Sequence, residues 1–147
     1  MAILLLTLLI VGNSLNSANW VELPGLSWVF VWAALAGMIL AKTKAPAPLL
    51  HAGGLLLGAV VVTWQTSSLI EDESISVQVP EMWDRLTLWY QAASSGGIST
   101  DLLPFTLALL STAWLLGYAG SWFIFRSNNV WVAVVLAGIV LLTNLSF

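Results

Sequence analysis

Long apolar stretches with almost no charged residues constrain this chain more than any other feature. Of its 147 residues, 59% are hydrophobic and 7% are charged, against roughly 25% charged residues in ordinary soluble domains. Four Lys and Arg with seven Asp and Glu supply too few polar side chains to cover a surface that faces water. The composition therefore excludes an ordinary soluble domain and predicts a chain that contacts lipid.

Five apolar runs approach the length of a membrane-spanning helix. A bilayer core about 30 Å thick needs about 20 apolar helical residues. The runs cover residues 1–20, 26–41, 49–66, 102–125 and 130–147. We therefore predict an all-α integral membrane protein, a single membrane domain over 1–147 with about five transmembrane helices. The first run could also be a signal-peptide segment, but no Lys or Arg precedes it, so we expect a retained helix.

Prolines and capping residues mark the ends of these runs. Pro46 and Pro48 follow the second run, where proline interrupts a continuing helix. Asp101, after Ser99 and Thr100, offers a capping side chain in front of the fourth run. Pro104 then falls in the first turn of that run, a position that tolerates proline. These signals support separate helices joined by short connections.

The one long polar stretch, residues 67–101, has two parts. Glu71, Asp72 and Glu73 predict a solvated acidic loop, since a calcium loop needs spaced oxygen ligands and a turn glycine. After Pro80, apolar residues recur with the spacing of one helix face. They are Met82, Trp83, Leu86, Trp89, Tyr90 and Ala93. We predict an amphipathic helix that lies in the membrane interface.

The charged residues divide by connection. Lys42, Lys44 and Arg126 lie in the second and fourth connections, which share a side if all five runs span. The positive-inside rule makes that side cytoplasmic. The acids lie in the other connections, with the single base Arg85: Glu22, Glu71, Asp72, Glu73, Glu81, Asp84 and Asp101. We therefore expect a cytoplasmic N-terminus and an extracytoplasmic C-terminus.

Small residues recur at every fourth position of the apolar runs. In lipid, helices associate through close contacts between such residues and through interhelical hydrogen bonds, because the hydrophobic effect does not drive them together. The positions expected to make helix contacts are Gly37, Gly54, Gly58, Ala113, Gly117 and Ser121. The sequence leaves open whether these positions contact one another or a partner.

The nine tryptophans sort by predicted depth. Seven fall near a predicted interface, where an aromatic belt is typical of membrane proteins. They are Trp20, Trp28, Trp64, Trp83, Trp89, Trp122 and Trp131. Trp32 and Trp114 lie deeper, where core packing, lipid contact or contact with a cofactor ring are the alternatives.

His51 is the nearest candidate for a functional group within a run. No charged residue lies at the centre of any run, which disfavours pumps, carriers and channels that use charged relays. A neutral imidazole one turn into the third run could ligate a tetrapyrrole metal, or hydrogen-bond within the protein or face lipid headgroups. The chain has no Cys, which removes thiol nucleophiles. We predict no catalytic residue, no metal site and, with few basic residues, no nucleic-acid partner.

Several short motifs, taken in order, resemble a known family. They are Ala18-Asn19-Trp20, Trp83-Asp84-Arg85, the segments 95–101, 114–118 and 122–126, and Gly138 with 142–145. This order resembles the N-terminal membrane region of bacterial transglutaminase-like membrane proteins, over nearly all of the chain. The resemblance implies a bacterial inner-membrane anchor, followed by further spans and an extracytoplasmic domain with a Cys-His-Asp triad. Because this chain has no Cys, the resemblance assigns a catalytic role to none of its residues.

Two functional hypotheses follow. The first is a non-enzymatic polytopic membrane module that anchors a transglutaminase-like protein or serves as an accessory subunit of a larger membrane complex. Its partners would be the bilayer and other membrane subunits, with no required cofactor. The alternative is a small subunit of a photosynthetic or respiratory complex, motivated by His51 and the deep tryptophans, that binds a lipid, carotenoid, chlorophyll-type pigment or quinone. A small transporter is disfavoured because no internal repeat is evident.

Overall fold

Helices account for all of the regular structure that is described. The computed structural model describes residues 6, 10, 25–70, 74–135 and 138. The long helices are α2 (Leu26–Lys42), α3 (Ala47–Ser67), α4 (Ile75–Ser94) and α5 (Leu103–Ser127), and residues 130–135 are also helical. No strand occurs in these ranges. The prediction of an all-α chain is therefore confirmed for the described residues.

Local sequence explains where the helices begin and end. Gly25, with φ of 66°, precedes α2 in the left-handed conformation that glycine adopts without strain. Proline occupies the first turn of both α3 and α5, as Pro48 and Pro104. The helix α3 thus begins two residues before the predicted boundary, because a first-turn N–H has no intrahelical partner to lose. Asn128, with φ of 52°, ends α5 in a left-handed cap.

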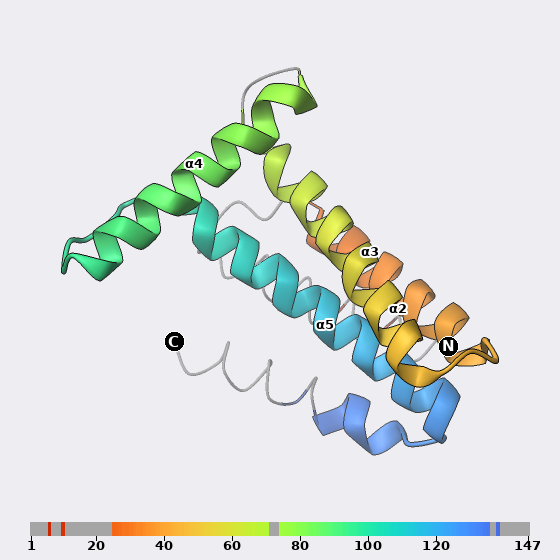
Figure 1. The fold of residues 1–147 in the computed structure, drawn as a ribbon. Helices are drawn as coiled ribbons and strands as arrows, with labels where there is room; N and C mark the ends of the chain where they lie inside the picture. The colour runs from red at the N-terminus through yellow and green to blue at the C-terminus, as the bar shows by residue number, and fades with distance from the viewer. Residues whose placement is uncertain (1–5, 7–9, 11–24, 71–73, 136–137, 139–147) are drawn as a thin grey trace.

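Three helices, α2, α3 and α5, lie side by side, and α4 crosses one end of this group at a steep angle (Figure 1). The helices α2 and α5 point the same way, since Gly117 packs on Ala33 and Arg126 further along α5 reaches the carbonyl of Ala41. The helix α3 runs opposite to both, because its start lies beside the later part of α5. The end of α2 at Lys42 and the end of α5 at Arg126 therefore lie at the same end of the bundle.

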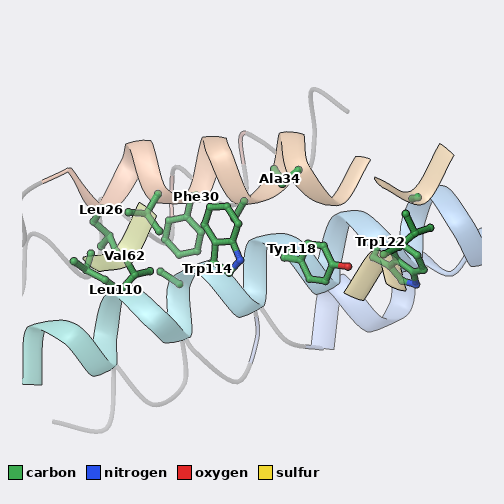
Figure 2. Packing of buried hydrophobic residues seen from close by; sticks show 14 residues of the cluster. Leu26, Phe30, Ala34, Val62, Leu110, Trp114, Tyr118 and Trp122 are labelled. Carbon is green, nitrogen blue, oxygen red and sulfur yellow. The ribbon is translucent and has the colours of Figure 1, made fainter. Parts of the chain in front are cut away.

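The main core lies between α2 and α5 (Figure 2), and Leu50 and Val62 of α3 belong to the same cluster. Phe30 and Leu110 are almost fully buried there, at 1% and 0% exposure, and Trp114 is 2% exposed. A second, smaller cluster of Ile70, Met82 and Leu103 fixes α4 to the ends of α3 and α5. The crossing helix is thus attached through few buried side chains.

The helix α4, which we predicted to lie in the membrane interface, differs from its prediction in length and in the use of its apolar face. It begins at Ile75, not after Pro80, and Pro80 lies inside it. Pro80 is the sixth residue of α4, past the first turn, so it removes one intrahelical hydrogen bond and its ring crowds the carbonyl of the preceding turn. The predicted apolar face also divides. Met82 is 1% exposed against the bundle, whereas Trp83 and Tyr90 are 59% and 69% exposed.

The prediction of five membrane spans is not supported. Two described helices, α3 with 21 residues and α5 with 25, are long and apolar enough to cross a membrane. The apolar helix α2 has 17 residues and is therefore about 26 Å long, short of a bilayer core about 30 Å thick. The runs predicted at 1–20 and 130–147 lie mostly outside the described residues.

Candidate functional site

Small residues bring the backbones of α2 and α5 into close contact. A Cβ added to Gly37 would lie 2.6 Å from the carbonyl oxygen of Tyr118 and 2.8 Å from the Cβ of Ser121. One added to Gly117 would lie 2.9 Å from the Cβ of Ala33. Ala113, one turn before Gly117, is also buried. The predicted packing positions of α2 and α5 thus face each other within this chain.

The two predicted glycines of α3 make a different contact. Gly54 lies under the ring of Tyr118, and Gly58 lies under the indole of Trp114. Trp114 also donates its indole N–H to the carbonyl of Gly54 over 3.2 Å. Gly54 and Gly58 are four residues apart, and so are Trp114 and Tyr118. On these antiparallel helices, one aromatic ring therefore packs against one glycine at each of two successive turns. The sequence predicted that the two glycines make helix contacts, but it did not predict that Trp114 and Tyr118 pack against them.

His51 belongs to an aromatic group near the start of α3, which we call the histidine cluster: His51, Tyr118 and Trp122. Its Nδ1 lies 2.9 Å from the Tyr118 hydroxyl, and either group can donate in this hydrogen bond. Its ring centroid lies 4.3 Å from that of Trp122. Trp122 is 6% exposed, so it packs inside the bundle and not outward as an interfacial anchor would. The hydrogen bond joins residues 67 positions apart.

A shallow apolar groove opens beside the histidine cluster. Its volume is about 270 Å³, below the roughly 300–1,000 Å³ of pockets that hold drug-sized ligands. The cluster lines one part of it, and the rest is lined by Leu55, Leu115, Ala119 and Phe123. His51 is therefore placed beside a narrow apolar surface. Among the described residues, no group of three or more acidic or histidine side chains could hold a metal ion.

Basic residues gather where α2 and α5 end together. The Arg126 guanidinium donates to the carbonyls of Ala41 at 3.2 Å and Thr43 at 2.9 Å. It also lies over the Trp122 ring, 5.7 Å from its centroid. Lys42 lies over the ring of Phe125 at 5.5 Å. We call this region, with exposed Lys44, the basic end. A cation at a helix C-terminus is favourable because the last carbonyls carry partial negative charge.

The opposite end holds an ion pair between Arg85 of α4 and Asp101. Arg85 donates Nε to Oδ2 at 2.7 Å and Nη2 to Oδ1 at 2.5 Å. These hydrogen bonds are the main cause that lowers the pKa of Asp101, against an opposing effect of burial. They likewise raise the pKa of Arg85. Asp101 also accepts the backbone N–H of Leu103 at 3.0 Å, so it joins α4 to the first turn of α5.

The remaining tryptophans differ in exposure. Four of the predicted anchors on the long helices face outward and are between 41% and 64% exposed, and Trp131 is 76% exposed. The four are Trp28, Trp64, Trp83 and Trp89. Of the two deeper residues, Trp114 is buried and Trp32 is 52% exposed. Trp20 lies outside the described residues. The deep tryptophans thus do not share one site, because one packs in the core and the other faces out.

No family model, curated protein or solved structure matches this chain. The resemblance to transglutaminase-like membrane proteins therefore stays a prediction that depends on the motifs alone.

Proposed function

We propose that the chain is a non-enzymatic membrane module, with α2, α3 and α5 in the bilayer and α4 along the membrane surface. In this role it anchors a larger transglutaminase-like protein or packs as an accessory subunit of a membrane complex. The proposal assigns the described residues a structural task and no catalytic step.

The observation that carries the proposal is the side-chain distribution on α3. Only 22% of an apolar 18-residue stretch of this helix is buried in the protein. Most of its large apolar side chains point outward, with Leu56 69% and Val60 66% exposed, while Gly54 and Gly58 are buried. Exposing apolar surface to water costs about 25 cal/mol per Å², whereas lipid removes that cost. Small residues inside and large ones outside are typical of helices that pack in a membrane.

The position of the charges supports the same placement. The described Lys, Arg, Asp and Glu residues all lie on α4 or near the ends of the bundle: Lys42, Lys44, Glu81, Asp84, Arg85, Asp101 and Arg126. A charge at the centre of a spanning helix is costly, whereas a charge near its end reaches water or headgroups. The middle of the bundle can therefore lie in lipid without burying a charge.

A cysteine-labelling experiment tests the membrane placement. The chain has no Cys, so a single introduced Cys gives an unambiguous signal. Leu56 is 69% exposed in the protein, so the surrounding membrane would shield Leu56→Cys from a water-soluble maleimide in open membrane sheets. Ser68→Cys, exposed just beyond the same helix, is the matched control. We expect slow labelling of the first variant, rapid labelling of the second, and equal labelling of both after denaturation. Equal rates in intact membranes would refute the placement.

A second measurement separates the anchor from the accessory subunit. The intact mass of the native polypeptide is measured, together with the proteins that co-purify in mild detergent. A mass well above the 15.8 kDa of this chain, with a transglutaminase-like domain in the added sequence, supports the anchor. A mass near that value with stoichiometric partners supports the subunit. A chain of this mass that purifies alone as a monomer would contradict both versions.

A further inference from the structure

We propose that the basic end and the groove beside the histidine cluster together bind one anionic phospholipid. The phosphate would lie by Arg126 and Lys44, and one acyl chain would lie in the groove. This inference rests on the membrane placement proposed above and adds a specific lipid class as a ligand.

Charge selects the headgroup. Three cations, Lys42, Lys44 and Arg126, lie at the basic end, since Arg126 bonds to the carbonyl of Thr43 between the two lysines. The described acids are Glu81, Asp84 and Asp101, all on α4 or just before α5 at the opposite end. The basic end therefore has a net positive charge among the described residues, which favours an anionic headgroup.

The shape of the groove suits an acyl chain. The groove extends along α5 from Leu115 to Phe123, a rise of about 12 Å. Its exposed lining is entirely apolar, so it suits a hydrocarbon chain and offers little to a free phosphate ion. Its volume of about 270 Å³ suits a linear chain better than a tetrapyrrole macrocycle.

The two parts are continuous through Trp122. Its indole lines the groove and lies under the Arg126 guanidinium, with 5.7 Å from the guanidinium carbon to the ring centroid. Arg126 is held there by two backbone carbonyls. A lipid whose phosphate contacts this end therefore has its first methylene groups beside Trp122 and the mouth of the groove. A preorganised cation next to an apolar channel is the arrangement that a charged amphiphile fits.

Lipid selectivity of the full chain in mild detergent tests this site. Binding of phosphatidylglycerol is compared by native mass spectrometry with that of phosphatidylcholine of identical acyl chains, and with glycerol phosphate, which has no chain. We expect phosphatidylglycerol to bind more tightly than either. Lys44→Gln should weaken it about fivefold, since one basic residue contributes about 1 kcal/mol at an anionic membrane surface. Arg85→Gln removes the same charge at the opposite end and is the matched control.

A variant in the groove separates the contribution of the acyl chain to lipid binding from that of the charged headgroup. Ala119 lines the groove and is half-buried, so Ala119→Phe should fill it and weaken binding of the lipid, with all cations retained. Equal binding of phosphatidylglycerol and phosphatidylcholine would overturn the proposal. An equal loss of phosphatidylglycerol binding in Arg85→Gln and Lys44→Gln would also overturn it. Binding of glycerol phosphate as tight as that of the lipid, or a quinone or pigment in the native extract that competes with it, would also overturn it. If Leu56→Cys stays shielded in membranes while lipid selectivity is absent, only this site is refuted.

Discussion

Adding one methyl group at the crossing of α2 and α5 should destabilise the protein. In Gly37→Ala the new Cβ would meet the Tyr118 carbonyl oxygen at 2.6 Å, whereas ordinary carbon to oxygen contacts lie at about 3.3–3.6 Å. The helices must therefore move apart by about 0.7–1.0 Å. The obstructing atom belongs to the backbone of a packed helix, so no side-chain rotation relieves the contact.

The size of the effect follows from two opposing contributions. Overpacking a well-packed contact costs about 1–3 kcal/mol. Replacing Gly by Ala within a helix favours the helix by about 0.5–1 kcal/mol. We expect a net loss of about 1–2 kcal/mol in the free energy of unfolding. Gly53→Ala provides the control, because a Cβ at Gly53 meets nothing within 4 Å, and this variant should be more stable than the natural chain.

The assay is unfolding of the full chain in mixed micelles with increasing dodecyl sulfate, followed by far-ultraviolet circular dichroism. A Gly37→Ala variant as stable as the natural chain would refute the reasoning. The double variant Gly37→Ala with Ser121→Gly tests the cause. The double variant removes the contact at 2.8 Å between the new Cβ at residue 37 and the Cβ of Ser121, but it leaves the Tyr118 carbonyl in place. It should therefore recover only part of the lost stability. Full recovery would show that the carbonyl is not the obstacle.

Three further outcomes are expected in the same unfolding assay. Because Arg85 holds the pKa of Asp101 below its ordinary value of 3.8, the pair stabilises the fold above that pH and loses its effect as pH falls below it. The stability difference between the natural chain and Asp101→Asn should therefore be constant near neutral pH and shrink below about pH 4; an unchanging difference would contradict the assignment. Ser121→Ala removes a buried hydroxyl that has no hydrogen-bond partner among the described residues and should raise the unfolding free energy, whereas Ser67→Ala, which deletes a hydroxyl bonded to a backbone carbonyl, should lower it; the same sign for both would count against this reading. Tyr118→Phe deletes the hydrogen bond of the histidine cluster and should cost about 1 kcal/mol, so a fully stable variant would show that the bond is not formed.

The positions of the helices were predictable because their signals are local. The apolar runs, the first-turn prolines and the glycine before α2 act within a few residues, so the predicted ranges 26–41, 49–66 and 102–125 lie within three residues of α2, α3 and α5 at each end. Pro80 predicts a helix that begins after it, because an interior proline is locally unfavourable, yet α4 begins at Ile75.

Partners across helices needed the tertiary structure. Periodicity shows that Gly54 and Gly58 share a face, but it does not show that Trp114 and Tyr118 fill that face. The burial of Trp122 likewise depends on its neighbours on other helices, because depth along a helix does not determine which way a side chain points.

The sequence by itself determined the helical class, the helix ranges and the separation of charges along the chain, since these follow from composition and local chain chemistry. The tertiary structure decided that α2 and α5 pack directly on each other, that His51 bonds to Tyr118 and that Arg126 reaches the end of α2. These contacts join residues 67 and 85 positions apart. They depend on close packing in three dimensions, which a one-dimensional pattern of apolar residues does not encode.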